Sequence, residues 1–294
     1  MSPIIYFILI IRLFLGKEDK KRYKEKLGIY KDKKNNESRL VWFHACSVGE
    51  VRSISKLING FLSRRYSILI TSNTLLSAKY VKENFPDKVK HLFLPIDFKF
   101  ATKKFLSHWK PSIGIFIESE IWPNLIRGCN KNKIPLVLAQ ARFSKNTLKK
   151  WYLFKKFFRA LLESFDLIIA QSSATKKELY KYANIKVNTI YNLKNSSPQL
   201  NIKRNEVNKI NKNIHDKFII TALSTHEGEE RILLKALKEI SKKIKHTVLI
   251  LQPRHPHRAN KIIKQIQKYN FTWKQKSLFE YPNLENQIIG YNSV

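Results

Sequence analysis

The sequence predicts an α/β protein with two doubly wound, parallel-sheet domains. From residue 40 onward, short continuous apolar runs alternate with segments of helical period, the pattern of a parallel sheet covered on both faces. Residues 196–216 are polar and aperiodic, which indicates a linker. A second strand–helix series begins at residue 217, and a length of 294 residues suits two domains.

The first 30 residues contain an apolar segment, residues 3–15, that predicts an N-terminal helix. Arg12 interrupts the segment, which is shorter than the ~20 residues that span a bilayer. It also lacks the basic start and small-residue cleavage site of a secretory signal. A basic cluster follows: Lys17, Lys20, Lys21, Arg22, Lys24 and Lys26. This pattern favours attachment to the cytoplasmic face of an anionic membrane, the alternative being an ordinary first helix packed on the domain.

The first domain is predicted to occupy residues 31–195. Its predicted strands are Leu40–Ala45, Ser67–Thr71, Lys90–Leu94, Ser112–Ile117, Leu136–Ala139 and Asp166–Ala170. Its predicted helices are Val51–Arg65, Leu75–Asn84, Ala101–Trp109, Ile121–Asn132, Thr147–Ser164 and Ala174–Tyr182.

The second domain is predicted to occupy residues 217–294. Its predicted strands are Phe218–Leu223, Thr247–Leu251 and 286–291, and its predicted helices run from 227 to 243 and from about 259 to 269. The sequence stops at Val294 without a terminal helix, an unusual place for a parallel sheet to end. We therefore expect this domain to be incomplete.

The composition favours a folded protein with anionic partners. Hydrophobic residues make up 43%, and 56 basic against 22 acidic residues give a net charge of +34. Such a charge favours nucleic acid, an anionic membrane or a phosphorylated substrate, although a general richness in Lys, Asn and Ile accounts for part of it. No recognisable nucleic-acid module is present, so no specific nucleic-acid partner is expected.

The cysteines are Cys46 and Cys129, too few for a disulfide framework, which indicates a reducing cytoplasmic compartment. Cys46 follows His44 by two residues, which would suit a thiol nucleophile or half of a metal site. No further ligands stand at usable spacing, so a small core residue is the favoured interpretation. Neither a metal nor a cofactor is expected.

The stretch Leu40–Glu50 is the strongest candidate for a site. A buried strand ends near Ala45, and a helix opens at Ser47, with Glu50 at the spacing of a capping box. Gly49 permits close approach of a ligand. A carboxylate at the C-terminal end of a strand lies where open α/β sheets place their sites, while Glu50 as a helix cap alone is the alternative.

Two further strand ends of the first domain carry polar residues. Glu118 and Glu120 follow one strand and precede Pro123, which suits an early helical position. They could flank a sugar or hold a cation, or simply stabilise the first turn of the helix. Arg142 follows the next strand and suits a carboxylate or phosphate.

In the second domain, Ser224 and Glu227 have capping-box spacing at a predicted helix start, where free N–H groups would form an anion site. Arg254 follows the next strand and would point into the same crevice. An ordinary surface cation is the alternative for Arg254, although the prolines on either side stiffen its loop.

Taken together, these stretches resemble the Kdo (3-deoxy-D-manno-octulosonic acid) transferases of lipopolysaccharide synthesis over essentially the whole chain. The motifs that carry the resemblance are FHACSVGE at Phe43–Glu50, ESEIWPN at Glu118–Asn124, ARFS at Ala141–Ser144, NLK at Asn192–Lys194, STHEGEE at Ser224–Glu230 and PRHP at Pro253–Pro256.

The resemblance implies a GT-B-like architecture of two Rossmann-like domains facing a cleft. It implies inverting transfer of Kdo from CMP-Kdo to a lipid A precursor at the inner face of the cytoplasmic membrane, with Glu50 as general base. The implied acceptor-side residues are Ser47, Gly49, Glu118, Glu120 and Arg142. The implied donor-binding residues are Lys194, Ser224, Thr225, Gly228 and Arg254.

The chain departs from the family pattern in three places. Gln140 stands where the family usually has Asn, and residues 71–74 replace a more glycine- and threonine-rich turn. The glycine-rich stretch and Glu-Pro that follow in the family are missing, so the chain is expected to be truncated, with weak or absent turnover. The competing hypotheses are an inactive membrane-surface remnant of the same family and a nucleic-acid-binding protein, which would bind DNA or RNA with strong salt dependence.

Overall fold

The computed structural model describes residues 10–16, 18–30, 39–196, 217–276 and 287–291. It contains two compact units, Met1–Gln199 and Leu200–Val294, and each is described by itself. Residues 197–216 of the predicted linker and residues 3–9 of the predicted apolar helix lie outside the described residues. Residues 10–14 are helical. No helix in the described parts of the chain has the length and apolarity needed to cross a membrane.

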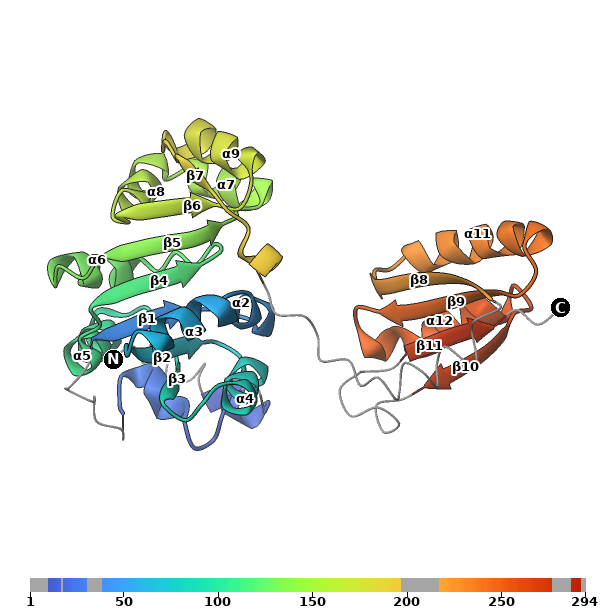
Figure 1. The fold of residues 1–294 in the computed structure, drawn as a ribbon, viewed down its shortest axis with the longest axis horizontal. Helices are drawn as coiled ribbons and strands as arrows, with labels where there is room; N and C mark the ends of the chain where they lie inside the picture. Colours follow the sequence, from blue (N-terminus) through green and yellow to red (C-terminus); the bar gives the residue numbers. More distant parts are fainter. Residues whose placement is uncertain (1–9, 17, 31–38, 197–216, 277–286, 292–294) are drawn as a thin grey trace. The chain divides into compact units, whose positions relative to one another are not determined.

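Unit 1 is built on a parallel seven-stranded sheet with the order β3-β2-β1-β4-β5-β6-β7 (Figure 1). Its strands are β1 (Leu40–His44), β2 (Ser67–Ser72), β3 (Val89–Phe93), β4 (Ile113–Ile117), β5 (Leu136–Ala141), β6 (Leu167–Ala170) and β7 (Thr189–Ile190). The sequence pattern correctly predicted β1 to β6 and missed only the two-residue β7. The strand order reverses between β1 and β4, which is where such sheets bind ligands, beyond the carboxyl ends of the strands.

Strand β1 is buried on both faces, which explains its continuous apolar run. Leu40 and Trp42 belong to one core cluster, and Val41 and Phe43 belong to the cluster on the opposite face. On the neighbouring strand β4, Gly114 leaves room for the side chains of Leu136 and Trp42. A Cβ atom at Gly114 would lie 2.8 Å from Leu136 and 3.1 Å from Trp42, closer than packed side chains tolerate.

Helices cover both faces of the sheet: α2 (Val48–Ser53), α3 (Ser55–Ser63), α4 (Leu75–Asn84), α5 (Lys99–Trp109), α6 (Pro123–Lys131), α7 (Lys145–Tyr152), α8 (Lys155–Leu162) and α9 (Ser173–Ala183). Two predicted helices are each divided in the structure. Helix 51–65 breaks at Ile54, where Ser53 Oγ donates to the Glu50 carbonyl at 2.7 Å, a bond that competes with helix geometry. Helix 147–164 breaks at Phe154, whose backbone is not helical.

The N-terminal segment is fastened to the edge strand β3. Arg22 of the segment preceding η1 (Tyr23–Leu27) pairs with Glu25 at 2.7 Å and lies over the Phe93 ring at 4.8 Å. Glu25 accepts the Phe93 N–H at 2.8 Å, which satisfies a donor of the sheet edge. Lys26 is buried and pairs with Glu18 at 2.6 Å. Arg22 and Lys26, two cations of the predicted membrane-facing cluster, therefore form contacts within unit 1.

Unit 2 contains β8 (Phe218–Thr225), β9 (Thr247–Pro253), β10 (Thr272–Lys276) and β11 (Gln287–Tyr291), with α11 (Glu229–Lys243), η3 (Pro256–Arg258) and α12 (Ala259–Gln267). The sheet order is β10-β11-β9-β8. Only β8 and β9 are parallel, so the prediction of a wholly parallel second sheet is wrong. The predicted third strand is present as antiparallel β11. Strand β10 was missed because its sequence TWKQK has no apolar run.

Candidate functional site

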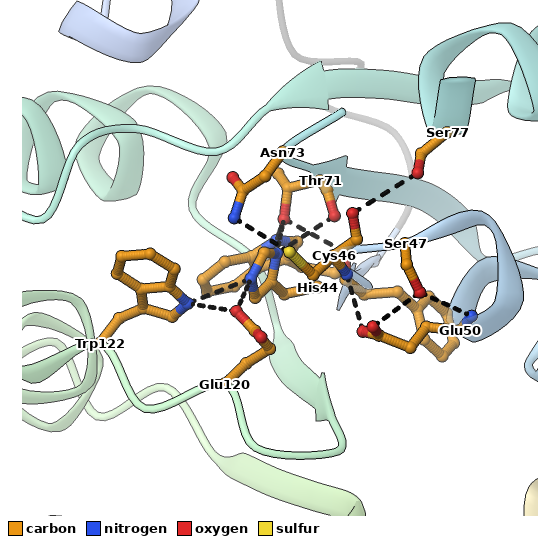
Figure 2. Close-up of polar contacts among 11 residues, drawn as sticks. His44, Cys46, Ser47, Glu50, Thr71, Asn73, Ser77, Glu120 and Trp122 are labelled. Carbon is orange, nitrogen blue, oxygen red and sulfur yellow. Dashed lines mark hydrogen bonds and ion pairs between the residues drawn. The ribbon is translucent and has the colours of Figure 1, made fainter. Parts of the chain in front are cut away.

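The Glu50 carboxylate is fixed where β1 passes into α2. Ser47 is the N-cap of α2, its hydroxyl accepts the Glu50 N–H at 3.3 Å, and it donates to Glu50 Oε1 at 2.8 Å. Glu50 Oε2 accepts the Cys46 N–H at 2.8 Å (Figure 2). The predicted capping interaction is confirmed, although the backbone donor is Cys46 instead of Ser47.

The environment of Glu50 favours the protonated form. Burial raises the pKa of Glu50 most strongly, the hydrogen bonds from Ser47 and Cys46 oppose it, and the charges of Glu120 and Glu118 add to the rise. Each carboxylate oxygen still has a second lone pair beyond the bond that it accepts. Gly49 is exposed, and a Cβ atom there would meet only Ser47, so the surface beside Glu50 is open. A fixed carboxylate with a raised pKa, next to an open surface, is suited to accept a proton.

A second carboxylate, Glu120, reaches the end of β1 from the loop after β4. His44 Nε2 lies 3.0 Å from Glu120 Oε2, and the Trp122 indole N–H donates to the same oxygen at 2.9 Å. Burial acts to raise the pKa of Glu120, but the hydrogen bond and charge of His44, with the Trp122 bond, hold this pKa below its usual value. Figure 2 shows both carboxylates beside the segment that joins β1 to α2.

His44 is held from behind by a buried chain of hydrogen bonds. Its side chain is fully buried, and Nδ1 lies 3.0 Å from Thr71 Oγ1, which accepts the Trp42 indole N–H at 2.9 Å. Nδ1 also lies 3.1 Å from the Thr71 carbonyl, so Thr71 engages one ring nitrogen of His44 while Glu120 engages the other. The orientation of the Glu120 carboxylate is therefore supported by side chains of β1 and β2.

Cys46 does not have the properties of a nucleophile. Burial, followed by the negative charge of Glu120, raises the pKa of Cys46 to about 11, although the Asn73 side-chain amide donates to the sulfur at 3.3 Å. A thiol with this pKa is almost entirely protonated at neutral pH. The contribution of Cys46 to the site is its backbone N–H, which holds Glu50.

Glu118 ends β4 in a left-handed conformation, with φ of 62°. Its carboxylate accepts bonds from Lys194 Nζ at 3.0 Å and from the Gln140 side-chain amide at 3.3 Å. Lys194 belongs to η2 (Leu193–Ser196), distant in sequence, and Gln140 has φ of 57° and is fully buried. The structure thus joins Glu118, predicted on the acceptor side, to Lys194, predicted on the donor side.

The alternative that Glu118 and Glu120 simply stabilise the first turn of a helix does not fit the structure. Helix α6 begins at Pro123, as Pro123 itself suggested, and its first turn contains no acidic residue. Asp97, from the segment between β3 and α5, supplies the missing charge: its two carboxylate oxygens accept the N–H groups of Asn124 and Leu125 at 3.0 and 2.9 Å. Neither glutamate is therefore needed to cap α6.

Arg142, directly after β5, is exposed and has no hydrogen-bond or ion-pair partner in the described part of the chain. It remains available for an anionic ligand.

In unit 2, Ser224 and Arg254 lie at the carboxyl ends of β8 and β9. Ser224 has φ of 61°, and Arg254 Nη1 lies 3.5 Å from its hydroxyl. Thr225 points inward instead, because its buried hydroxyl donates to Glu230 Oε1 at 2.8 Å. Glu230 also pairs with Arg258 at 2.9 Å, an interaction that sequence analysis did not identify.

The predicted Ser224–Glu227 capping box is wrong. Helix α11 begins at Glu229 with Gly228 as N-cap, Glu227 instead pairs with Lys261, and the Glu229 carboxylate accepts the His226 N–H at 2.7 Å. Glu229 stands three residues after His226, and this second acidic residue was the sequence signal for the later helix start. In the described residues, no group of three or more His, Cys, Asp or Glu side chains is arranged to hold a metal.

Comparisons with known proteins place this geometry in a family. Residues 21–197, which contain the unit 1 site, match the family Glycos_transf_N, described as 3-deoxy-D-manno-octulosonic-acid transferase (kdotransferase). The chain belongs to the Kdo transferase family. It is 34% identical to the transferase of Rickettsia bellii and 32% identical to that of Haemophilus influenzae, and each comparison covers 98% of this chain and 69% of the relative.

Solved structures agree on the fold of this Kdo transferase family member. A glycosyltransferase from Rickettsia africae matches with a TM-score of 0.56 at 13% identity, over 80% of this chain and 66% of that chain. A UDP-GlcNAc 2-epimerase from Neisseria meningitidis bound to UDP-GlcNAc matches with a TM-score of 0.54 at 13% identity, over 79% and 69%. At these identities the likeness shows the fold alone, an α/β fold of the GT-B-like class.

Sequence reasoning missed the supporting residues of the site. His44 was considered only beside Cys46 as half of a metal site, Trp122 only as part of a motif, and Thr71, Asn73 and Asp97 were given no role. The signal of His44, Thr71, Asn73 and Asp97 is weak, because each acts on a residue that is far away in the sequence.

Proposed function

We propose that the chain is an inverting glycosyltransferase that moves Kdo from CMP-Kdo to a lipid A precursor in lipopolysaccharide synthesis, with Glu50 as general base. The observation that supports it is the Glu50 carboxylate: fixed by two hydrogen bonds, raised in pKa and beside the open surface at Gly49, in a chain of the Kdo transferase family.

In the proposed reaction, an acceptor hydroxyl oxygen attacks the anomeric carbon of Kdo. The bond from that carbon to the CMP phosphate oxygen breaks, CMP leaves with the electron pair, and the hydroxyl proton passes to Glu50. Attack opposite to the leaving group inverts the configuration. A positioned general base contributes about 10²–10⁴-fold to such a step.

The other site residues divide between the two substrates in this proposal. Ser47 orients Glu50, while Glu120 and Arg142 shape the acceptor side, with Arg142 suited to an anionic group. Glu118 serves the same side and positions Lys194 through their ion pair.

Donor binding would use three further residues, Ser224, Gly228 and Arg254, whereas the buried Thr225 hydroxyl, also expected there, is bonded to Glu230. Arg254 would contact the donor's phosphate or carboxylate, and the bond from Arg254 to Ser224 would orient it.

We place the reaction at the cytoplasmic face of the inner membrane. Phe14 and Leu15 expose 88% and 61% of their surfaces, and Lys20, Lys21 and Lys24 are exposed nearby in sequence. Exposed apolar side chains followed by cations suit the interface of an anionic bilayer.

The test separates catalysis by Glu50 from capping by Glu50. In Glu50→Gln, the amide oxygen can still accept the Cys46 N–H and the amide N–H can donate to Ser47, so the cap persists while the base is lost. Labelled Kdo transfer to a lipid A precursor in detergent, with CMP-Kdo generated in place, is measured for the parent, Glu50→Gln, Glu50→Ala and the exposed control Glu83→Gln.

We expect kcat to fall about 10²–10⁴-fold in both Glu50 variants and to stay unchanged in the control. Thermal unfolding should shift in Glu50→Ala and hardly in Glu50→Gln. Transfer retained by Glu50→Gln would reduce Glu50 to a cap. No transfer by a folded parent would favour the alternative of an inactive remnant that binds the membrane surface.

A further inference from the structure

We propose a second binding site in unit 1, separate from Glu50, that takes a phosphate monoester group. A hollow of about 330 Å³ lies among helices α7, α8 and α9, and it is lined by Lys149, Tyr152, Lys155, Lys181 and Tyr182. Its volume falls at the lower end of the range for small-molecule sites, about 300–1,000 Å³. None of these five residues forms a hydrogen bond or ion pair with a residue of the Glu50 site in the described structure.

The walls of the hollow are held by the core of unit 1. The Tyr152 and Tyr182 rings meet edge to face, 6.3 Å apart, and join α7 to α9. Trp151, next to Tyr152, stacks on the buried Phe158 of α8 at 4.8 Å. The hollow is therefore a built feature of three packed helices, as a site that binds without large rearrangement requires.

The charge of the hollow is uncompensated. Its lining contains three lysines and no carboxylate, and none of these lysines has an ion-pair partner among the residues that the structure describes. Lys26 and Lys194, by contrast, are each paired with a glutamate. Lys155 Nζ lies 5.7 Å from the centre of the Tyr152 ring, and Lys181 Nζ lies 5.6 Å from that of Tyr182. Such contacts hold an ammonium group over an aromatic wall.

This lining favours a phosphate monoester over other anions. A monoester carries close to two negative charges and three terminal oxygens, which match three ammonium groups, while the tyrosine rings offer apolar surface to the attached alcohol. Leu153 and Phe154, in the turn between α7 and α8, expose 81% and 65% of their surfaces. The same chemistry could come from a soluble phosphate monoester or from a lipid headgroup whose tails meet this turn.

The test uses the full chain and two probes. Calorimetric titration with sn-glycerol 3-phosphate reports the soluble source. Co-sedimentation with phosphatidylcholine vesicles that contain phosphatidic acid, a monoester, or phosphatidylglycerol, a diester, reports the lipid source. The variants are Lys149→Gln/Lys155→Gln/Lys181→Gln, the charge-neutral change Tyr152→Ala, and a matched control, Lys88→Gln/Lys103→Gln/Lys131→Gln. Circular dichroism establishes that each variant is folded.

We expect the lysine variant and Tyr152→Ala to weaken binding of one or both monoester probes about tenfold or more, and the control to leave it within about twofold. The probe that responds identifies the source. Equal weakening in the lysine variant and its control, or equal binding of phosphatidic acid and phosphatidylglycerol vesicles, would show attraction by net charge alone and overturn the proposal. Absence of monoester binding by the parent would also overturn it.

Discussion

At the scale of residues, the site contains two carboxylates in opposite electrostatic states. Glu50 is raised in pKa by burial, while the His44 and Trp122 contacts hold the pKa of Glu120 down against burial. A carboxylate with a raised pKa beside one with a lowered pKa is the arrangement that separates a proton acceptor from a charge that positions or stabilises. In the proposed reaction these roles fall to Glu50 and Glu120.

The raised pKa of Glu50 predicts a pH dependence of activity. The base must be ionised, so kcat/KM should rise with pH through a midpoint above the value of about 4.3 for an exposed glutamate. Measurement of kcat/KM against pH checks this midpoint, and an acid limb at or below the ordinary glutamate value would contradict it.

The raised pKa of Glu50 also makes the folding stability depend on pH. Because the folded state holds the Glu50 proton more tightly than the unfolded state, this stabilisation is fully present below the unfolded pKa and is lost as pH rises through the folded pKa. Glu50→Gln should therefore gain stability relative to the parent over the same rise in pH, as chemical denaturation at several pH values would show.

At the scale of elements, α6 is positioned by a cap from outside its own sequence. Asp97 satisfies the first N–H groups of α6, and its backbone carbonyl accepts the Asn124 side-chain amide at 2.6 Å. The loop that carries Glu120 and Trp122 is thus anchored at β4 on one side and at α6 on the other. A cap supplied by a distant residue ties the geometry of the site to the β3–α5 connection.

Loss of this cap should destabilise the fold and disturb the site. We expect Asp97→Ala to lower the free energy of unfolding by about 1 kcal/mol, within a range of about 0.5–2, because two backbone N–H groups lose a charged acceptor. The corresponding fall in melting temperature is about 2–4 °C per kcal/mol for a domain of this size. The exposed Asp87→Ala is the control, and an equal change in both variants would argue against capping by Asp97.

At the scale of the whole molecule, the net charge of +34 causes self-repulsion that destabilises the folded state. Binding partners and salt can reduce this repulsion. Buried pairs such as Lys26–Glu18 are little screened by salt, whereas repulsion among exposed lysines is screened within about 8–10 Å at physiological ionic strength.

We therefore expect the melting temperature to rise as sodium chloride is increased from low to physiological concentration. Differential scanning calorimetry at fixed pH checks this trend. A melting temperature that falls with added salt would show that favourable ion pairs outweigh repulsion.

The predictions from the sequence pattern were accurate where the residues that specify an element lie close together in the sequence. Strands β1 to β6, β8, β9 and β11 were predicted from apolar runs that must be buried. The capping interaction was predicted from the spacing of Ser47 and Glu50. Three helix boundaries were predicted wrongly. At Ile54 a serine hydrogen bond interrupts the helix, and at Phe154 the backbone is not helical. The third helix begins at Glu229, later than predicted. Hydrogen bonds of this kind depend on side-chain directions that periodicity does not contain.

The sequence by itself determined the α/β class, the succession of strands along the chain and the capping interaction of Glu50 at a strand end, because burial and capping act over a few residues. Only the tertiary structure decided that β1 and β4 are neighbours at the reversal of strand order. That neighbourhood brings His44 to Glu120, and the packing of the rest of unit 1 brings Lys194 to Glu118 and Asp97 to α6. Contacts between residues far apart in sequence are set by sheet pairing and core packing, and so the electrostatic state of the site is a property of the folded chain alone.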